Sequence, residues 1–166
     1  YKGIASDYLR ILKKRLGLNI EILENLTWKQ VIEGARDKRV DLLLAVGKTK
    51  ERENYLSYTQ PYLNFHRVIT VRDDAKFIFG LNDLKDFKVG VQVNSSHHGY
   101  LIENTDIKPV LYETLQESLL ALSGGASDAY VGNVASIVYW AKKLNLSNVK
   151  IAAPVSNEIQ SLHFAV

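Results

Sequence analysis

The sequence contains no cysteine and no methionine among its 166 residues. Without a thiol, the protein has no disulfide and no thiolate metal site, and this composition suits an exported protein. No apolar run approaches the roughly 18 residues of a membrane span, and no signal peptide stands at the start. Because methionine is absent, we expect the natural start codon to lie outside this sequence and the chain to be trimmed at both ends.

A strong charge of either sign is also lacking. The 21 basic residues exceed the 18 acidic ones by a formal net charge of +3. The basic residues are spread along the chain, so a nucleic-acid partner is not expected. The one tight cluster, Lys13–Arg15, falls in the last turn of an expected helix, where cations complement the helix dipole. A hydrophobic content of 46% is enough for the core of one large domain or two small lobes.

Capping signals and hydrophobic periodicity predict five helices and several short strands. Thr27 and Gln30 fit a capping box, in which a hydroxyl and an amide satisfy free backbone groups at a helix start, and Thr114 and Glu117 fit a second one. The expected helices are 4–16, 28–37, 94–104, 115–122 and 133–144. The apolar face of the first is expected to be Ile4, Tyr8, Ile11, Leu12 and Leu16. The expected strands are 19–23, 40–46, 67–72, 88–93, 108–112, 128–131, 149–153 and 162–166.

The two halves of the chain repeat one pattern: a capped helix, then an aspartate, then an apolar strand that ends at a glycine. Alternating helices and strands imply parallel sheets. We therefore predict an α/β fold of two lobes, each a mostly parallel sheet flanked by helices. Two crossover segments, near 71–75 and 154–161, would let the lobes hinge shut on a ligand. The expected bounds are 1–72 for lobe 1, 73–156 for lobe 2 and 157–166 for a return strand into lobe 1.

The stretch 41–62 is the first candidate for a binding site. An apolar strand ends at Gly47, and the polar run that follows carries Arg52. Ligands of open α/β sheets bind outside the carboxyl ends of the strands, and a guanidinium group fits a carboxylate with two parallel hydrogen bonds. Arg52 is therefore a candidate anchor for an anionic small molecule. The alternative is a surface arginine paired with Glu51 or Glu53.

Five further residues are candidates with a structural alternative. Trp28, in the first turn of its helix, either fills the core or offers a flat wall to a ligand, and Tyr62 is a similar case. Ser95 and Ser96 open a helix, where they cap it and can also bind an anion through free amides and hydroxyls. Asn133 follows a strand and a glycine, so it either caps the next helix or faces the ligand.

Signals for catalysis or metal binding are weak. The pair His97–His98 lacks the spacing and the carboxylates of a metal site, so no metal is expected. The sequence has no GxSxG, Walker loop, GxGxxG or HExxH motif, and no pair of carboxylates stands out as an acid–base couple. We therefore expect no cofactor and no enzymatic activity in this chain.

At the level of motifs, the chain resembles the type II periplasmic solute-binding proteins of the family 3 kind, in particular the Venus-flytrap sensor domains of bacterial histidine kinases and diguanylate cyclases. The resemblance rests on T-x-E-R followed by T-x-P-Y, then D-L and G-x-x-D-A, and spans nearly the whole chain. The segment GNVASIVYWAKKLNLSNVKIAAP is similar to receptor domains more than to transport proteins. We expect the first strand and the closing C-terminal helix of the family, with any ligand contacts of that strand, to be absent from this sequence.

The resemblance implies a role for several positions. Arg52 matches the arginine that binds the ligand carboxylate, and Trp28 matches an aromatic that stacks on the ligand. Ser95 and Ser96 match second-lobe residues that meet the carboxylate. Asn133 stands where amino-acid binders often carry an acid for the ligand ammonium, so a neutral amide there argues against an amino-acid ligand. Two positions match residues that give backbone or hydroxyl contacts, although the glycine has no hydroxyl to give: Ala45 and Gly47.

The function that this resemblance implies is ligand binding by an extracytoplasmic sensor domain. The expected ligand is a small anionic solute, an amino acid or an organic acid. The domain would be tethered to the membrane as the periplasmic part of an inner-membrane histidine kinase, and a homodimer is one expected arrangement. The alternative is the substrate-binding protein of an amino-acid-type ABC uptake transporter. A third hypothesis is that the chain is an enzyme, which would require carboxylates in the cleft that act as acid and base.

Overall fold

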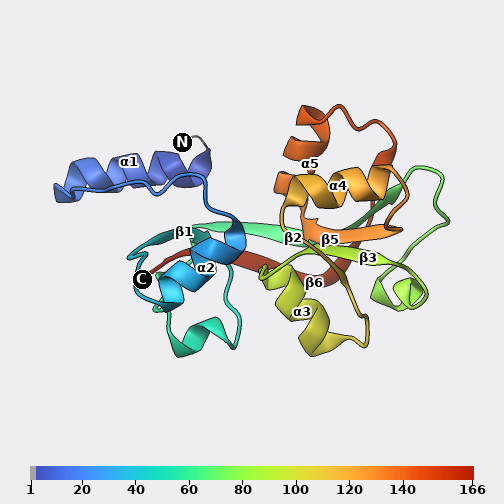
Figure 1. Ribbon diagram of the computed structural model, residues 1–166, viewed down its shortest axis with the longest axis horizontal. Coiled ribbons are helices and arrows are strands. Elements are labelled where there is room, and N and C mark those ends of the chain that lie inside the picture. The colour runs from blue at the N-terminus through green and yellow to red at the C-terminus, as the bar shows by residue number, and fades with distance from the viewer. Residues whose placement is uncertain (1–2) are drawn as a thin grey trace.

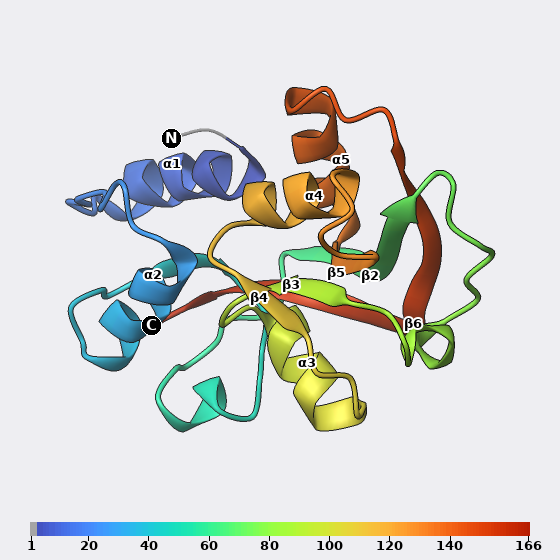
Figure 2. The same ribbon diagram turned by 45° about the vertical axis from the view of Figure 1, so that its right-hand side comes forward.

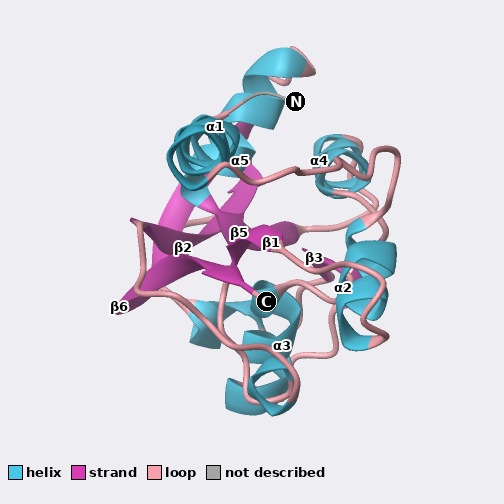
Figure 3. Ribbon diagram, turned by 90° about the vertical axis from the view of Figure 1, so that its left-hand side faces the viewer, coloured by secondary structure: helices cyan, strands magenta, loops and turns pink. Residues whose placement is uncertain are grey.

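Two long antiparallel strands, β2 (Leu63–Arg72) and β6 (Val149–Ala165), run through the centre of the molecule (Figure 1). The computed structural model describes residues 3–166. Its six-stranded sheet has the order β1-β6-β2-β5-β3-β4. The remaining strands are β1 (Leu43–Val46), β3 (Val89–Gln92), β4 (Val110–Tyr112) and β5 (Ala129–Asn133). Figure 3 shows the strands as a central layer with helices around it.

Helices cover the sheet on more than one side. Figure 2 shows α4 and α5 on one side of the sheet and α3 on the other. The helices are α1 (Ile4–Leu16), α2 (Trp28–Arg36), α3 (Ser96–Asn104), α4 (Leu115–Ser123) and α5 (Val134–Lys143). The remaining elements are two short 3-10 turns, at Arg52–Asn54 and Leu81–Leu84. The result is the mixed α/β fold that the sequence predicts.

The start of each capped helix follows from a local signal. Thr27 accepts a hydrogen bond from the backbone of Gln30, whose side chain accepts one from the backbone of Thr27. Thr114 and Glu117 make the same reciprocal pair at the start of α4. Gly17 ends α1 in the left-handed conformation, with φ at 63°, which glycine adopts without steric cost. Both predicted capping boxes are therefore confirmed.

Separate clusters of apolar side chains hold the two parts of the sheet. In the first part, α2 and β1 pack with the end of β6 through a small group of buried residues: Ile32, Ala35, Leu43, Val46, Leu56 and Ala165. In the second part, one cluster includes Ile69, Val71, Leu84, Val89, Val91, Leu101 and Val131. The other joins α4 and α5 to the sheet and includes Val68, Leu119, Leu122, Tyr130 and Ile137. Burial of these side chains is the main favourable term in folding.

Two strand predictions are wrong. Residues 18–24 form no strand, because none of the described residues pairs with their backbone. The expected strands 149–153 and 162–166 are parts of one continuous strand, β6, so residues 154–161 do not interrupt the strand. The antiparallel pairing of β6 with β2 carries the strand through this region, with register shifts between His66 and Val68 and between Ile69 and Thr70.

The expected parallel order holds in the second half of the chain only. There β3 pairs parallel with both β4 and β5. In the first half, β1 pairs antiparallel with β6, because its neighbour in the sheet comes from the far end of the chain rather than from the preceding segment. The predicted apolar face of α1 is also wrong: the helix buries Ser6 and Leu9, and three of the expected residues are more than half exposed, namely Ile4, Ile11 and Leu16.

Neighbouring leucines of α4 provide a test of this packing. Leu119 is fully buried, whereas Leu120 is 52% exposed. We expect Leu119→Ala to lower the free energy of unfolding by about 2–5 kcal/mol, because it removes buried methyl groups and leaves a cavity. Leu120→Ala, the matched control, should change it by less than about 0.5 kcal/mol. Urea unfolding followed by circular dichroism measures both, and equal effects of the two substitutions would contradict the packing.

Candidate functional site

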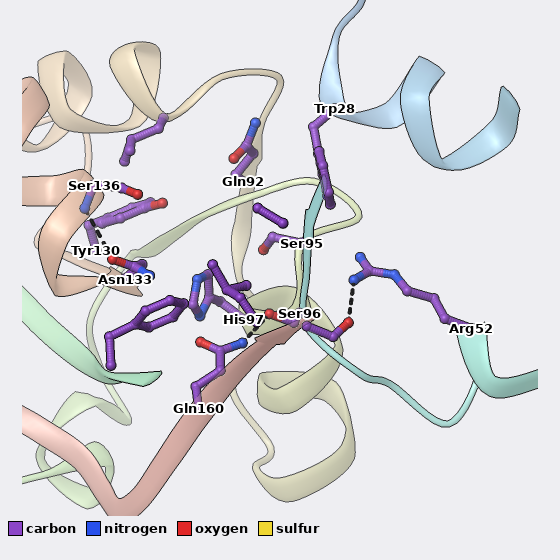
Figure 4. Close-up of a pocket in the computed structure, with 15 residues that line it drawn as sticks. Trp28, Arg52, Gln92, Ser95, Ser96, His97, Tyr130, Asn133, Ser136 and Gln160 are labelled. Carbon is purple, nitrogen blue, oxygen red and sulfur yellow. Dashed lines mark hydrogen bonds between the residues drawn. The ribbon is translucent and has the colours of Figure 1, made fainter. Parts of the chain in front are cut away.

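A cavity of about 250 Å³ lies where the two parts of the molecule meet (Figure 4). Seven of the eight predicted site residues line it: Trp28, Ala45, Gly47, Arg52, Ser95, Ser96 and Asn133. They come from α2, the end of β1 and the 3-10 turn on one side, and from the start of α3 and the end of β5 on the other. Sequence positions more than a hundred residues apart thus meet at one site, as the two-lobe interpretation requires.

Arg52 is the charged group of this cavity. Its side chain is only 3% exposed, and burial lowers the pKa of the guanidinium from its ordinary value, although Tyr58, Tyr55 and Glu51 act in the opposite direction. One of its N–H groups donates to the carbonyl of Gly47 at 2.9 Å, and another donates to the carbonyl of Asn94. A guanidinium has five N–H donors and stays charged at neutral pH, so donors remain for a ligand.

The carbonyl of Asn94 joins the two sides of the cavity. It accepts from Arg52 and also from the indole N–H of Trp28, at 2.9 Å. Asn94 has the left-handed conformation, with φ at 54°, which asparagine tolerates better than most residues. This turn precedes α3. Trp28 and Arg52 therefore both donate hydrogen bonds to one backbone atom of the opposite side. The centre of the Trp28 ring lies 5.7 Å from the Arg52 guanidinium carbon.

Two serines at the start of α3 line the cavity. Ser95 is the N-cap, and its hydroxyl accepts from the backbone N–H of His98 at 3.1 Å. The hydroxyl of Ser96 accepts from the side-chain amide of Gln160. Gly47 lies against both groups: a Cβ there would come within 2.9 Å of the Gln160 nitrogen and of the Ser96 oxygen. A larger residue at position 47 would therefore require the side chains of Gln160 and Ser96 to shift.

Asn133 both caps α5 and lines the cavity. Its side-chain oxygen accepts from the backbone N–H of Ser136 at 3.0 Å, so the predicted N-cap is confirmed. Asn133 is the Cα partner of Arg67 in the pairing of β2 with β5. Because the side-chain oxygen is engaged, the NH₂ group is the part of Asn133 left for a ligand.

His97 is a site residue that the sequence analysis missed. Its ring lines the cavity, and Figure 4 places it among Asn133, Ser96 and Gln160. Arg67 donates from Nε to His97 Nδ1 at 3.1 Å, and the Arg67 guanidinium carbon lies 3.9 Å from the centre of the Tyr100 ring. Burial and the charges of Arg67 and Arg52 lower the pKa of His97 to about 3. The imidazole is therefore neutral, with its proton on Nε2.

Tyr62 lies away from the cavity. Its hydroxyl donates to the carbonyl of Leu44 at 2.7 Å, and its ring packs between Phe164, at 4.8 Å, and Tyr8, at 5.0 Å. The structure thus gives Tyr62 a packing role. The lining residues that the sequence analysis did not single out are Phe65, Gln92, His97, Leu115, Tyr130, Ser136, Gln160 and Leu162. The positions of Gln92 at a strand end and Ser136 in a first helical turn were signals that could have found two of them.

The described part of the chain contains neither a candidate metal site nor a helix that could span a membrane. No group of three or more His, Asp or Glu side chains among residues 3–166 could hold a metal ion. None of the helices in this range is both long enough and apolar enough to cross a bilayer.

The fold and the site agree with one protein family. The family described as "Bacterial extracellular solute-binding proteins, family 3" matches residues 1–163, and this chain belongs to it. The solved structures show the same two-lobed fold. A histidine kinase sensor domain with similarity to periplasmic binding proteins has a TM-score of 0.89 at 24% identity, over 98% of this chain and 71% of that one. A mutant of arginine-bound ArgBP from T. maritima has a TM-score of 0.87 at 24% identity, over 99% of this chain and 76% of that one.

Curated relatives include both sensors and transport proteins. The virulence sensor protein BvgS of Bordetella pertussis is 24% identical over 93% of this chain, which covers 12% of BvgS. The L-cystine-binding protein TcyA of Bacillus subtilis is 28% identical over 98% of this chain, and 59% of TcyA is covered. The ABC transporter arginine-binding protein 1 of Escherichia coli is 24% identical over 92%, and 63% of that protein is covered. The chain therefore spans less than two thirds of each of these relatives.

The lowered pKa of His97 predicts an acid-sensitive stability. An unfolded histidine titrates near its ordinary pKa of about 6.5, whereas the folded one titrates at about 3. Between these values the unfolded chain binds more protons, so stability is complete above about pH 6.5 and is lost as the pH falls toward 3. We expect His97→Gln to reduce this loss. The exposed His66 provides the control variant His66→Gln, and urea unfolding at pH 7.5, 6 and 5 compares the slopes. An unchanged slope in His97→Gln would contradict the assignment.

Proposed function

We propose that this chain is the extracytoplasmic ligand-binding domain of a bacterial signal-transduction receptor of the histidine kinase type, and that it binds a small carboxylate-bearing solute in the cavity between its lobes. Membership of the solute-binding family supports the binding role. Similarity to BvgS and to a histidine kinase sensor domain supports the receptor.

The observation that supports anion binding is that the buried charge of Arg52 has no counterion among the described residues. The guanidinium is buried and meets two backbone carbonyls, and no ion pair of the described residues includes it. Burying a charge without a counterion is costly. A ligand carboxylate would supply that counterion, and the hydroxyl of Ser96 and the N-terminus of α3 would favour the same anion from the opposite side.

Signalling would follow from an equilibrium between open and closed forms. The contacts of Trp28 and Arg52 with the Asn94 carbonyl exist only when the two sides are together. A ligand shifts such an equilibrium only if it binds one form better than the other. A carboxylate held by Arg52 from one lobe and by Ser96 from the other has this property, because only the closed form offers both groups.

The division into lobes is part of the proposal. Lobe 1 would comprise residues 1–72, lobe 2 residues 73–156, and residues 157–166 would return to lobe 1. In the full-length receptor, the domain would be periplasmic and tethered to the inner membrane, where a homodimer would relay closure to the kinase.

Replacement of Arg52 tests the binding proposal. Thermal-shift screening of amino acids, organic acids and peptides identifies a ligand, and calorimetry measures its affinity. We expect Arg52→Ala to abolish binding or weaken it by about 2–5 kcal/mol, because a buried charge pair is lost. Arg52→Lys should also weaken binding, since an ammonium group lacks the planar fork. The control is Arg39→Ala, on the surface. Unchanged affinity in a folded Arg52→Ala protein would refute the role of Arg52.

The second candidate is the substrate-binding protein of an amino-acid-type ABC transporter. The similarity to the arginine-binding and L-cystine-binding proteins favours it. The gene sequence on either side of this chain decides between the two functions. A transmembrane helix and a kinase domain downstream would support the receptor, whereas an upstream lipobox and a stop codon shortly after the domain would support the transporter.

A further inference from the structure

We propose that the cavity selects a carboxylate that also carries a hydroxyl group and carries no cationic group. The inference rests on the proposed function, because it gives the ligand carboxylate to Arg52, and it adds the groups that hold the rest of the ligand. Three features of the cavity carry it: the absence of a carboxylate from its lining, a neutral N–H donor on His97, and a buried polar atom of Gln160 that has no partner.

The charges around the cavity disfavour an ammonium group. None of the described residues that line it is an aspartate or a glutamate. Two guanidinium groups lie close by, on Arg52 in the lining and on Arg67 behind His97. Neither forms an ion pair with a described carboxylate. A ligand ammonium would therefore be repelled by two like charges and would find no counterion in a site of low dielectric constant.

The tautomer of His97 sets the second requirement. Because Nδ1 accepts from Arg67, the single proton of the neutral ring is on Nε2. Nε2 makes no hydrogen bond to any residue in the described range, and the ring lines the cavity. The N–H of Nε2 is thus a neutral donor for the ligand. A group that meets it must have a lone pair, which a hydroxyl or carbonyl oxygen has and an ammonium lacks.

Gln160 sets the third requirement. Its Oε1 is buried without a hydrogen-bond partner, while its Nε2 donates to Ser96. A buried acceptor left unpaired is costly, and Gln160 lines the cavity, so a donor on the ligand would offset this cost. A hydroxyl group donates one hydrogen bond and accepts two, and Figure 4 shows Gln160 beside His97. One hydroxyl can therefore accept from His97 and donate to Gln160.

Matched pairs of small acids test this selectivity by calorimetry on the whole chain. The pairs are lactate and alanine, 3-hydroxybutyrate and 3-aminobutyrate, and malate and aspartate, each as both enantiomers, with pyruvate as an acid whose carbonyl accepts but cannot donate. We expect at least one hydroxy acid to bind, and to bind at least about 10-fold more tightly than its amino partner. Pyruvate should bind more weakly than lactate if lactate is the hydroxy acid that binds.

Variants assign the selectivity to the two residues. His97→Ala should weaken binding of the hydroxy acid about 10-fold by removing the donor, and His97→Gln should restore part of it, because the glutamine amide can donate near the same place. Gln160→Glu adds an anion, so it should shift the preference toward the amino acid of the same pair. The exposed His66 gives the control His66→Ala, which should bind like the unmodified chain.

The outcomes separate this inference from the proposed function. If an amino acid binds as tightly as its hydroxy partner, or if no hydroxy acid binds, the inference is overturned. The proposed function still holds in that case, provided that some other carboxylate binds and requires Arg52. If no anionic solute of the wider screen binds, or if Arg52→Ala leaves the affinity unchanged, the proposed function fails as well.

Discussion

The candidate site depends on one constraint: a guanidinium group is buried and forms no ion pair with any carboxylate of the described residues. Arg52 is held by the carbonyls of Gly47 and Asn94, which orient the charge but do not neutralise it. A positive charge placed in this way raises the free energy of the unliganded protein relative to a complex with an anion. The remaining features of the cavity, including the close approach at Gly47 and the start of α3, position groups around that charge.

Asn94 links Arg52 to the arrangement of the two lobes. Its carbonyl accepts hydrogen bonds from Trp28 and Arg52, so the geometry of the Arg52 side chain and the contact between the lobes depend on the same backbone atom. The left-handed conformation at Asn94 directs the chain into α3. In the proposed function, ligand binding and closure would be energetically coupled through these few atoms, which would be a sufficient basis for a solute-dependent change of shape.

Predictions from the sequence succeed where the controlling signal is local. The capped starts at Thr27 and Thr114 depend on residues three positions apart, and both form. The strand expected at 19–23 fails because a strand requires a partner that local sequence cannot supply. The same limit applies to the site. Arg52 stands out by its chemistry and its place after a strand, whereas the role of Gln160 depends on the long pairing of β6 with β2, and that of His97 on a contact with Arg67.

The pairing of β1 with β6 has a consequence for the order in which the chain becomes structured. Among the described strands, β1 has β6 as its only neighbour, and Val46 pairs with His163. During synthesis, β2, β3, β4 and β5 are all complete before this partner exists. The second lobe can therefore begin to fold while β1 still has an unpaired edge. Such long-range pairing is slow to form, and a chain that stopped before residue 163 would leave the part of the molecule that carries Arg52 unfinished.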